Sequence, residues 1–168
     1  MAVLDSPCWG GISPDMHRLL SGIGQKPFPQ RFYLAGGTAL ALQVGHRRSI
    51  DFDFFSETDD LGEKSRAEII HGLADFSVQI IENTTGNLLL LVDGIRTGFF
   101  GYGYPLVGKP VLLENIVLAS LVDIGLMKCV PLISRGSRKD FYDLFFIART
   151  EPIESLLGLG EKKYPQCS

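Results

Sequence analysis

A glycine-rich motif, Gly36-Gly37-Thr38, is followed shortly by two aspartates with one residue between them, Asp51-Phe52-Asp53. Apolar and other residues alternate along 49–56, which is typical of a strand with one buried face. In such a strand Asp51 and Asp53 point to the same side, with their Cα atoms roughly 7 Å apart. Their carboxylate oxygens can then converge on one or two divalent cations, Mg²⁺ or Mn²⁺. The competing interpretation is that both aspartates form the solvent face of an edge strand.

The glycine pair predicts a place where the backbone comes close to an anion. We expect a buried strand at 31–35 to stop at Gly36-Gly37, where no side chain keeps a phosphate away. Thr38 is predicted to cap a helix over Ala39–Val44 that Gly45 closes. This arrangement would aim a hydroxyl and free N–H groups at the anion. The two motifs together predict metal ligands beside a phosphate site.

Composition limits the classes of function. The chain has 168 residues, which fits one domain, and its 19 acidic and 16 basic residues give a formal net charge of -3. A protein that coats DNA would be basic, so any nucleic-acid contact must come from a local patch. The cysteines, Cys8, Cys129 and Cys167, form no CxxC pair, which favours a reducing compartment. Residues 1–11 lack a secretory signal, and the apolar segment 88–92 is too short to span a bilayer, so we expect a cytoplasmic protein without membrane contact.

The rest of the chain predicts a mixed sheet covered by helices. Residues 1–12 are expected to form a flexible, loosely held arm, and Ser13 should cap the first helix. Asp93-Gly94 is typical of a type I′ turn between two strands. The further predicted elements are helices at 62–76, 114–127 and 137–149, and strands at 77–82, 88–92 and 95–102.

This order of elements indicates an α/β fold of the α+β type rather than a regularly alternating βαβ domain. One domain is predicted over 13–150, with a sheet-containing core at about 30–105 and a helical part at about 112–150. Residues 151–168 are expected to be a C-terminal tail. Pro131 should end or kink the helix at 114–127. The core face predicted for the last helix consists of Phe141, Leu144, Phe145 and Ala148.

Several segments resemble the AbiEii/AbiGii family of nucleotidyltransferase toxins, over roughly 32–149. The first runs from Tyr33 through the glycine motif and on to Ser56, and two later ones cover 120–128 and 135–144. The resemblance implies a polymerase-β-like fold and transfer of a nucleoside monophosphate from an NTP. It also implies an RNA acceptor, above all the acceptor end of tRNA, and a cognate antitoxin. The tail at 151–168 is shorter than in this family, so part of the acceptor-binding surface is expected to be missing.

The resemblance assigns roles position by position. Gly36, Gly37 and Thr38 match the triphosphate-binding element, and Asp51 and Asp53 match the metal ligands. Lys128 matches a lysine that contacts the nucleotide phosphates. The late aspartate needed for activity matches either Asp140 or Asp143. Between the two early motifs, Arg48 and Ser49, with Arg47 before them, either contact phosphate or hold the turn.

The residues themselves support part of this assignment. Asp123 and Lys128 lie about 140° apart around a helix, so Lys128 is free to reach elsewhere, unless it is simply a solvated lysine. Asp140 and Asp143 share one helix face and point to the rim of a cleft or, alternatively, to a surface network. Basic residues occur here without an intervening acid, which is typical either of contact with RNA or triphosphate or of ordinary helix-end solvation. They are Lys128, Arg135, Arg138 and Lys139.

One expected group is missing. Polymerase-β-like transferases carry a third carboxylate on a strand next to the metal strand, but the corresponding segment, 96–100, contains no acid, and Asp93 lies in a turn. A late aspartate could fill this role. The alternative is a catalytically weak or inactive nucleotide- or RNA-binding module of the same fold. A third reading is a transferase that modifies a protein hydroxyl.

Overall fold

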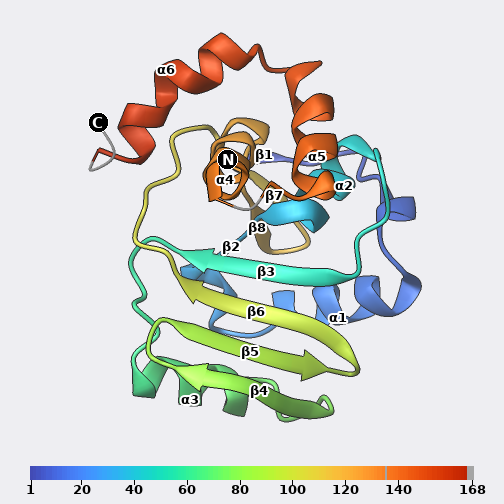
Figure 1. Cartoon of the computed structure of the whole chain (residues 1–168). Coiled ribbons are helices and arrows are strands. Elements are labelled where there is room, and N and C mark those ends of the chain that lie inside the picture. Colours follow the sequence, from blue (N-terminus) through green and yellow to red (C-terminus); the bar gives the residue numbers. More distant parts are fainter. Residues whose placement is uncertain (135, 166–168) are drawn as a thin grey trace.

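The strand that carries the two aspartates, β3 (Asp51–Ser56), lies inside a mixed sheet of eight strands. Figure 1 shows a computed structural model, which describes residues 1–134 and 136–165. β3 pairs antiparallel with β2 (Tyr33–Leu34) and parallel with β6 (Ile95–Gly101). The aspartates therefore do not lie on an edge strand. The mixed sheet covered by helices confirms the predicted fold class.

On one side of β3 the chain forms an antiparallel meander. β4 (Val78–Thr84), β5 (Asn87–Val92) and β6 follow one another in the sheet. Between β5 and β6, Asp93 and Gly94 have φ angles of 48° and 78°. Both values are positive, as a type I′ turn requires, so this predicted hairpin is confirmed.

On the other side of β3 the structure corrects the helix expected at 114–127. β7 (Val111–Leu113) and β8 (Ile116–Leu118) form an antiparallel hairpin, and α4 (Leu121–Ser134) begins only after it. The turn residues Glu114 and Asn115 have φ angles of 47° and 66°. A short apolar run can be read with either helical or strand spacing, and here the turn decides. Pro131 lies inside α4 and does not end it.

The helices α1, α2 and α3 precede β4 in the chain. α1 (Pro14–Gly24) begins as predicted, because Met16 N donates a hydrogen bond of 3.1 Å to Ser13 Oγ. α2 (Gly36–Val44) ends at Gly45, whose φ of 68° suits glycine. α3 (Glu63–Gly72) ends earlier than the predicted Phe76. In Figure 1, α3 lies beside β4, whereas α4 lies at the other side of the sheet, beyond β3.

The segment at 1–12, expected to be a loosely held arm, makes specific contacts. β1 (Ala2–Val3) pairs in parallel with β7, and Cys8 N donates a hydrogen bond of 2.8 Å to Leu42 O in α2. A short 3₁₀ turn at Trp9–Gly11 follows. Gly11 O in turn accepts a hydrogen bond of 2.8 Å from Ser49 N, just before β3. Backbone pairing therefore attaches this segment to the sheet and to the site.

The last predicted helix exists, but its buried face is different. α5 (Arg138–Ala148) buries Asp140, Asp143 and Ile147, whereas Phe141 and Phe145 are each 60% exposed. The prediction assumed that aromatic residues would point inward. Instead the two carboxylates turn inward because they meet cationic partners there, which offsets the cost of burying them.

A further helix, α6 (Ile153–Lys163), occupies the segment expected to be a tail. Its last residue, Lys163, is fully buried, and its Nζ lies 2.8 Å from both Asp123 Oδ1 and Pro105 O. Asp123 also accepts hydrogen bonds from the backbone N–H groups of Val107 and Gly108. These bonds connect α6 to the start of α4. Among the described helices, none is both long and apolar enough to cross a membrane.

Candidate active site

A cavity of about 650 Å³ opens in front of the polar face of β3. The strand alternates as predicted, with Phe52 and Phe54 in the core and Asp51, Asp53 and Phe55 on the accessible side. Residues of α2, the turn before β3, β6, α4 and α5 complete the wall. The charged residues that line it are Arg47, Arg48, Arg96, Lys128, Lys139, Asp51, Asp53 and Asp140.

The aspartate pair places two carboxylates next to each other at a partly buried site. Burial raises the pKa of Asp53 to about 6, and the neighbouring charge of Asp51 adds to this rise, while Arg96 and Lys128 oppose it. Arg96 Nη1 lies 3.9 Å from Asp51 Oδ2. Among the described residues, no side chain donates a hydrogen bond to the Asp53 carboxylate. A divalent cation would relieve the repulsion, and two carboxylates are the oxygen ligands that such a cation prefers.

The position of a third acid on the sheet is taken by other residues. In the parallel register of β3 and β6, Arg96 is paired with Asp51 and Gly98 with Asp53. Over residues 1–134 and 136–165, no three side chains of His, Cys, Asp or Glu form a group that could hold a metal ion. Asp140 lines the same cavity from α5. The groups at β3 that could hold a cation are therefore the carboxylate pair.

The glycine motif forms the N-terminus of α2 rather than a loop before it. The helix begins at Gly36 with Ala35 as its N-cap, so Thr38 does not cap it, contrary to the prediction. Gly36 has a φ of 67°, which a residue with a side chain rarely adopts. Ala35 offers no side-chain cap, and Gly37 lines the cavity. The first N–H groups of α2 are thus available to an anion.

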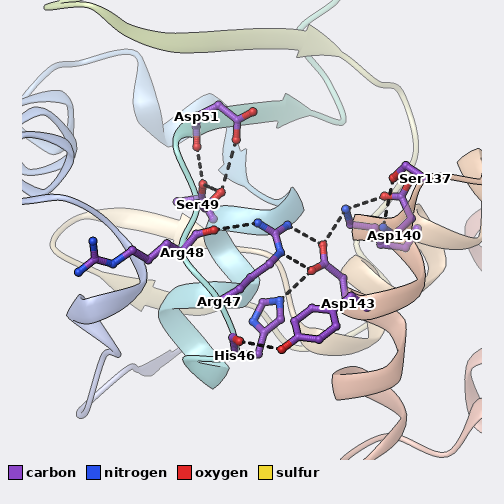
Figure 2. A network of polar contacts seen from close by, with 11 residues as sticks. His46, Arg47, Arg48, Ser49, Asp51, Ser137, Asp140 and Asp143 are labelled. Carbon is purple, nitrogen blue, oxygen red and sulfur yellow. Dashed lines mark hydrogen bonds and ion pairs between the residues drawn. The ribbon is translucent and has the colours of Figure 1, made fainter.

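Thr38 instead contacts β3 and the turn before it. It is buried in the first turn of α2, and its Oγ1 lies 2.8 Å from Ser49 Oγ and also reaches the carbonyl oxygen of Asp51. Ser49 Oγ lies 3.5 Å from Asp51 Oδ1, and Figure 2 shows these two residues side by side. The two hydroxyls therefore fix both the backbone and the carboxylate of Asp51.

Asp143 is the centre of a buried polar network (Figure 2). Its side chain is fully buried, and it accepts hydrogen bonds from Arg47 Nε at 2.7 Å and Nη2 at 2.9 Å. His46 Nε2 and Lys128 Nζ lie 2.7 Å and 2.9 Å from its two oxygens. Burial alone would raise the pKa of Asp143, but hydrogen bonds from Arg47, His46 and Lys128 outweigh it and hold the pKa well below the usual range. Asp143 thus orients cations and does not line the cavity.

Lys128 joins the two late aspartates. Its Nζ lies 2.8 Å from Asp140 Oδ1 and 2.9 Å from Asp143 Oδ2. Ser137 caps α5 by accepting a bond from Asp140 N, and its hydroxyl also donates to Asp140 Oδ2 at 2.6 Å. Lys128 is therefore not a solvated surface lysine. Asp140 is the late aspartate that reaches the cavity, and Asp143 is the one that supports it from behind.

The structure brings most of the predicted site residues together. Besides the residues above, Arg48 and Ser49 line the cavity, and the Arg48 side chain extends away from Arg47 and Asp143 in Figure 2. Of the predicted basic stretch, Lys128 and Lys139 line the cavity, Arg138 lies farther out, and Arg135 falls outside the described residues. Thr38 and Asp143 do not line this cavity.

A second, mostly apolar hollow of about 260 Å³ lies on the other side of Asp53. It shares Asp53, Phe55, Lys128 and Asp140 with the polar cavity. Its own lining comes from Gly36, Tyr102, Ile124, Met127, Val130 and Pro131. The two spaces form a polar and an apolar compartment around one carboxylate.

Some residues of the site were not predicted. His46 was not among the predicted site residues, and Arg47 was left between phosphate contact and a role in the turn. Arg47 both holds Asp143 and lines the cavity, because its guanidinium lies against Gly37, where a Cβ atom would collide with it. Arg96 was noted only as part of a strand without an acid. The run of His and Arg directly before the aspartate strand was the available signal.

One family model matches part of the chain, and one relative matches more of it. Residues 18–90 match the model of the family described as nucleotidyl transferase AbiEii toxin of type IV toxin–antitoxin systems. An uncharacterized protein of Aquifex aeolicus, aq_aa25, is 41% identical over 138 residues, which is 79% of this chain. The chain spans 66% of the length of that relative.

Solved structures of low sequence identity share the fold. The antibiotic-resistance factor ANT(2'')-Ia is similar with a TM-score of 0.64 and 12% identity, over 86% of each chain. The Megavirus polyadenylate synthase is similar with a TM-score of 0.55 and 15% identity, over 82% of this chain and 32% of its own. The chain is thus similar to the AbiEii nucleotidyltransferase family over residues 18–90, and it has the polymerase-β-like fold of these structures.

Proposed function

We propose that this protein is a metal-dependent nucleotidyltransferase that moves a nucleoside monophosphate from an NTP to an RNA acceptor, most simply the acceptor end of tRNA. It would act in the cytoplasm as the toxin of a toxin–antitoxin or phage-defence pair, opposed by a cognate antitoxin. The observation that carries the proposal is the aspartate pair of β3, which faces a cationic cavity beside the N-terminus of α2. The match of residues 18–90 to the AbiEii nucleotidyltransferase family supports the same chemistry.

The polar cavity suits a triphosphate. Free N–H groups at the start of α2 would bind phosphate oxygens. Arg47 lies over the same helix end, held by Asp143, so its charge faces the anion in a fixed position. Arg48 and Lys139 would neutralise the remaining phosphate charge from the rim.

The carboxylates of Asp51 and Asp53 would hold Mg²⁺ or Mn²⁺ together with phosphate oxygens of the NTP. When bound, such cations neutralise the leaving pyrophosphate and activate the attacking hydroxyl in an in-line displacement. Thr38 and Ser49 would keep Asp51 in place for this task. Lys128, between Asp140 and the cavity, would contact the nucleotide phosphates.

The apolar hollow suits the base of the nucleotide. Phe55 and Tyr102 provide aromatic surfaces, with ring centroids 5.3 Å apart, and Met127 provides a deformable apolar contact. The hollow joins the polar cavity at Asp53 and Lys128. A nucleotide could therefore place its base on one side of Asp53 and its phosphates on the other.

The proposal is tested by incubating the protein with each labelled NTP, Mg²⁺ and total tRNA. Label should move to RNA with the wild type and fall by at least about 100-fold with Asp51→Asn and with Asp53→Asn, because both remove a metal ligand. Thermal unfolding checks that the variants fold. NTP binding without any transfer would favour the non-catalytic module, and label on a protein would favour the protein-modifying transferase. Equal transfer by the Asp51 variant would exclude the metal-site assignment.

A further inference from the structure

The outer face of α5 carries aromatic residues between cations. Arg138, Phe141, Phe145 and Arg149 recur at intervals of three and four residues, which places them in one stripe along the helix. The stripe is about 16 Å long at a rise of 1.5 Å per residue. Phe141 and Phe145 are well exposed, and Tyr142 beside them is also exposed. Exposed rings that lie next to one another on a helix form a contiguous patch, which marks a candidate binding surface.

The stripe continues into the active-site cavity. A shallow hollow of about 560 Å³ is lined by Arg47, Arg138, Lys139, Phe141 and Tyr142. Arg47 and Lys139 also line the cavity in front of Asp51 and Asp53. A chain lying on α5 could therefore pass over Lys139 and place its end at the aspartate pair.

The rings of Tyr142 and Phe145 pack against Phe146. Tyr142 packs on Phe146 with centroids 5.0 Å apart, Phe145 packs edge-on to Phe146 at 5.4 Å, and the Arg149 guanidinium lies 5.8 Å from the Phe146 centroid. Tyr142 also stacks at 5.9 Å on His46, which is itself fixed by Asp143. Tyr142 and Phe145 are therefore preorganised, so little conformational entropy is lost when a ligand stacks on them.

The charges select the partner. Within the described residues, no ion pair involves Arg138, Lys139 or Arg149. A net charge of -3 makes this local gathering of unpaired cations distinctive for the chain. Cations that track a backbone, next to rings on which bases stack, are what single-stranded nucleic acid requires. An apolar protein segment would gain from the rings but not from the cations.

We propose that the outer face of α5 binds an unpaired strand of RNA by stacking its bases on Phe141 and Phe145, and guides the end of that strand into the cavity. This inference rests on the RNA acceptor of the proposed function. Arg138, Lys139 and Arg149 contact the phosphates. Because stacking is tolerant of sequence, the surface accepts any unpaired end and leaves selection to the cavity.

The test measures binding without chemistry. Fluorescence anisotropy of a short single-stranded RNA is recorded with the full chain in the absence of NTP. The doubly substituted Phe141→Leu, Phe145→Leu protein keeps an apolar face but loses the rings, so binding should weaken at least about fivefold for each ring. Phe141→Tyr with Phe145→Tyr should bind within about twofold of the wild type. Arg149→Gln should make the negative slope of log K against log salt less steep by about 0.7.

Controls separate the proposal from simpler explanations. Leu157→Ala removes an equally exposed apolar side chain from α6 and should leave RNA binding unchanged. A fully paired RNA hairpin should bind more weakly than the single strand, because its bases cannot reach the rings. Single-stranded DNA of the same sequence tests the choice of nucleic acid, and tighter binding of DNA would overturn the RNA assignment.

Other outcomes would also overturn the proposal. These are equal binding by the leucine and wild-type proteins, equal binding of the hairpin, or a dimer that the leucine substitutions dissociate while RNA binding stays unchanged. NTP binding, measured by calorimetry, should be the same in the leucine variant and the wild type. If RNA binds as expected but no label is transferred, the proposed function fails while the docking surface stands. If label is transferred but RNA binding ignores the rings, the reverse holds.

Discussion

Asp143 accepts hydrogen bonds from both Nε and Nη2 of Arg47, at 2.7 Å and 2.9 Å, although the two residues are 96 positions apart in the chain. This two-point ion pair connects α5 to the turn that precedes β3. It therefore sets how the helical part, with Asp140, faces the part that carries the aspartate pair. The orientation of a guanidinium in the cavity depends on a carboxylate that the cavity itself does not expose.

Breaking this pair should cost stability. Asp143→Ala leaves Arg47, His46 and Lys128 without their shared acceptor in a buried place, and we expect a loss of about 3–5 kcal/mol in the free energy of unfolding. Urea denaturation measures it. The matched control is Asp15→Ala, which removes the exposed partner of Arg18 and should change stability by less than about 1 kcal/mol. Similar values for both variants would contradict a structural role of Asp143.

The same residue predicts how stability depends on pH. The folded pKa of Asp143 lies below that of the unfolded chain, so its contribution is present above the unfolded value and is lost as pH falls toward the folded one. The wild type should lose stability below about pH 4. Asp143→Asn should be less stable at neutral pH and flatter in this acidic window. Parallel curves for the two proteins would show that Asp143 is not the group responsible.

Asp53 should act in the opposite direction. Its pKa is raised to about 6, so the folded state favours the protonated form, and stability falls as pH rises from about 4 through 6. Asp53→Asn should therefore be more stable than the wild type by about 2–3 kcal/mol at pH 8 and equal to it at pH 3.5. The measurement is urea denaturation without divalent cations. Adding Mg²⁺ should stabilise the wild type and not the variant.

Gly37 can be tested against Arg47. Gly37→Ala places a methyl group against the guanidinium, so the pair with Asp143 must move, and nucleotide transfer should fall by about tenfold or more. Replacing Arg47 as well, in Gly37→Ala with Arg47→Ala, removes the collision. The effects on stability should then be less than additive in a double-mutant cycle. Strict additivity would mean that the two side chains do not compete for this space.

Local patterns were enough to predict β3, one turn and one helix cap. The alternation at 49–56, the Asp93-Gly94 turn and the Ser13 cap depend on neighbours in the sequence, and all three occur in the structure. The motif order also predicted that Lys128 and either Asp140 or Asp143 would approach the aspartates. Lys128 and Asp140 line one cavity with them, and Asp143 does not. Each of these signals is local or is carried by a recognisable motif.

The errors arose where distant partners decide. The buried face of α5 could not be found from apolar spacing, because its carboxylates turn inward only when Arg47, His46 and Lys128 come from elsewhere to meet them. Thr38 looked like a cap because of its place after two glycines, but its hydroxyl serves the neighbouring strand. The hairpin at Glu114 and Asn115 was missed because neither residue is glycine, although both adopt positive φ angles.

The buried ammonium group of Lys163 gives the end of the chain an unexpected importance. Its Nζ donates hydrogen bonds to Asp123 Oδ1 and Pro105 O. Removal of Lys163 itself would strand the negative charge of Asp123 inside the protein, where an uncompensated charge is costly. The shortest version of this protein that still folds should therefore include the whole of α6, and a protease that cuts within that helix should inactivate the protein far from its catalytic groups.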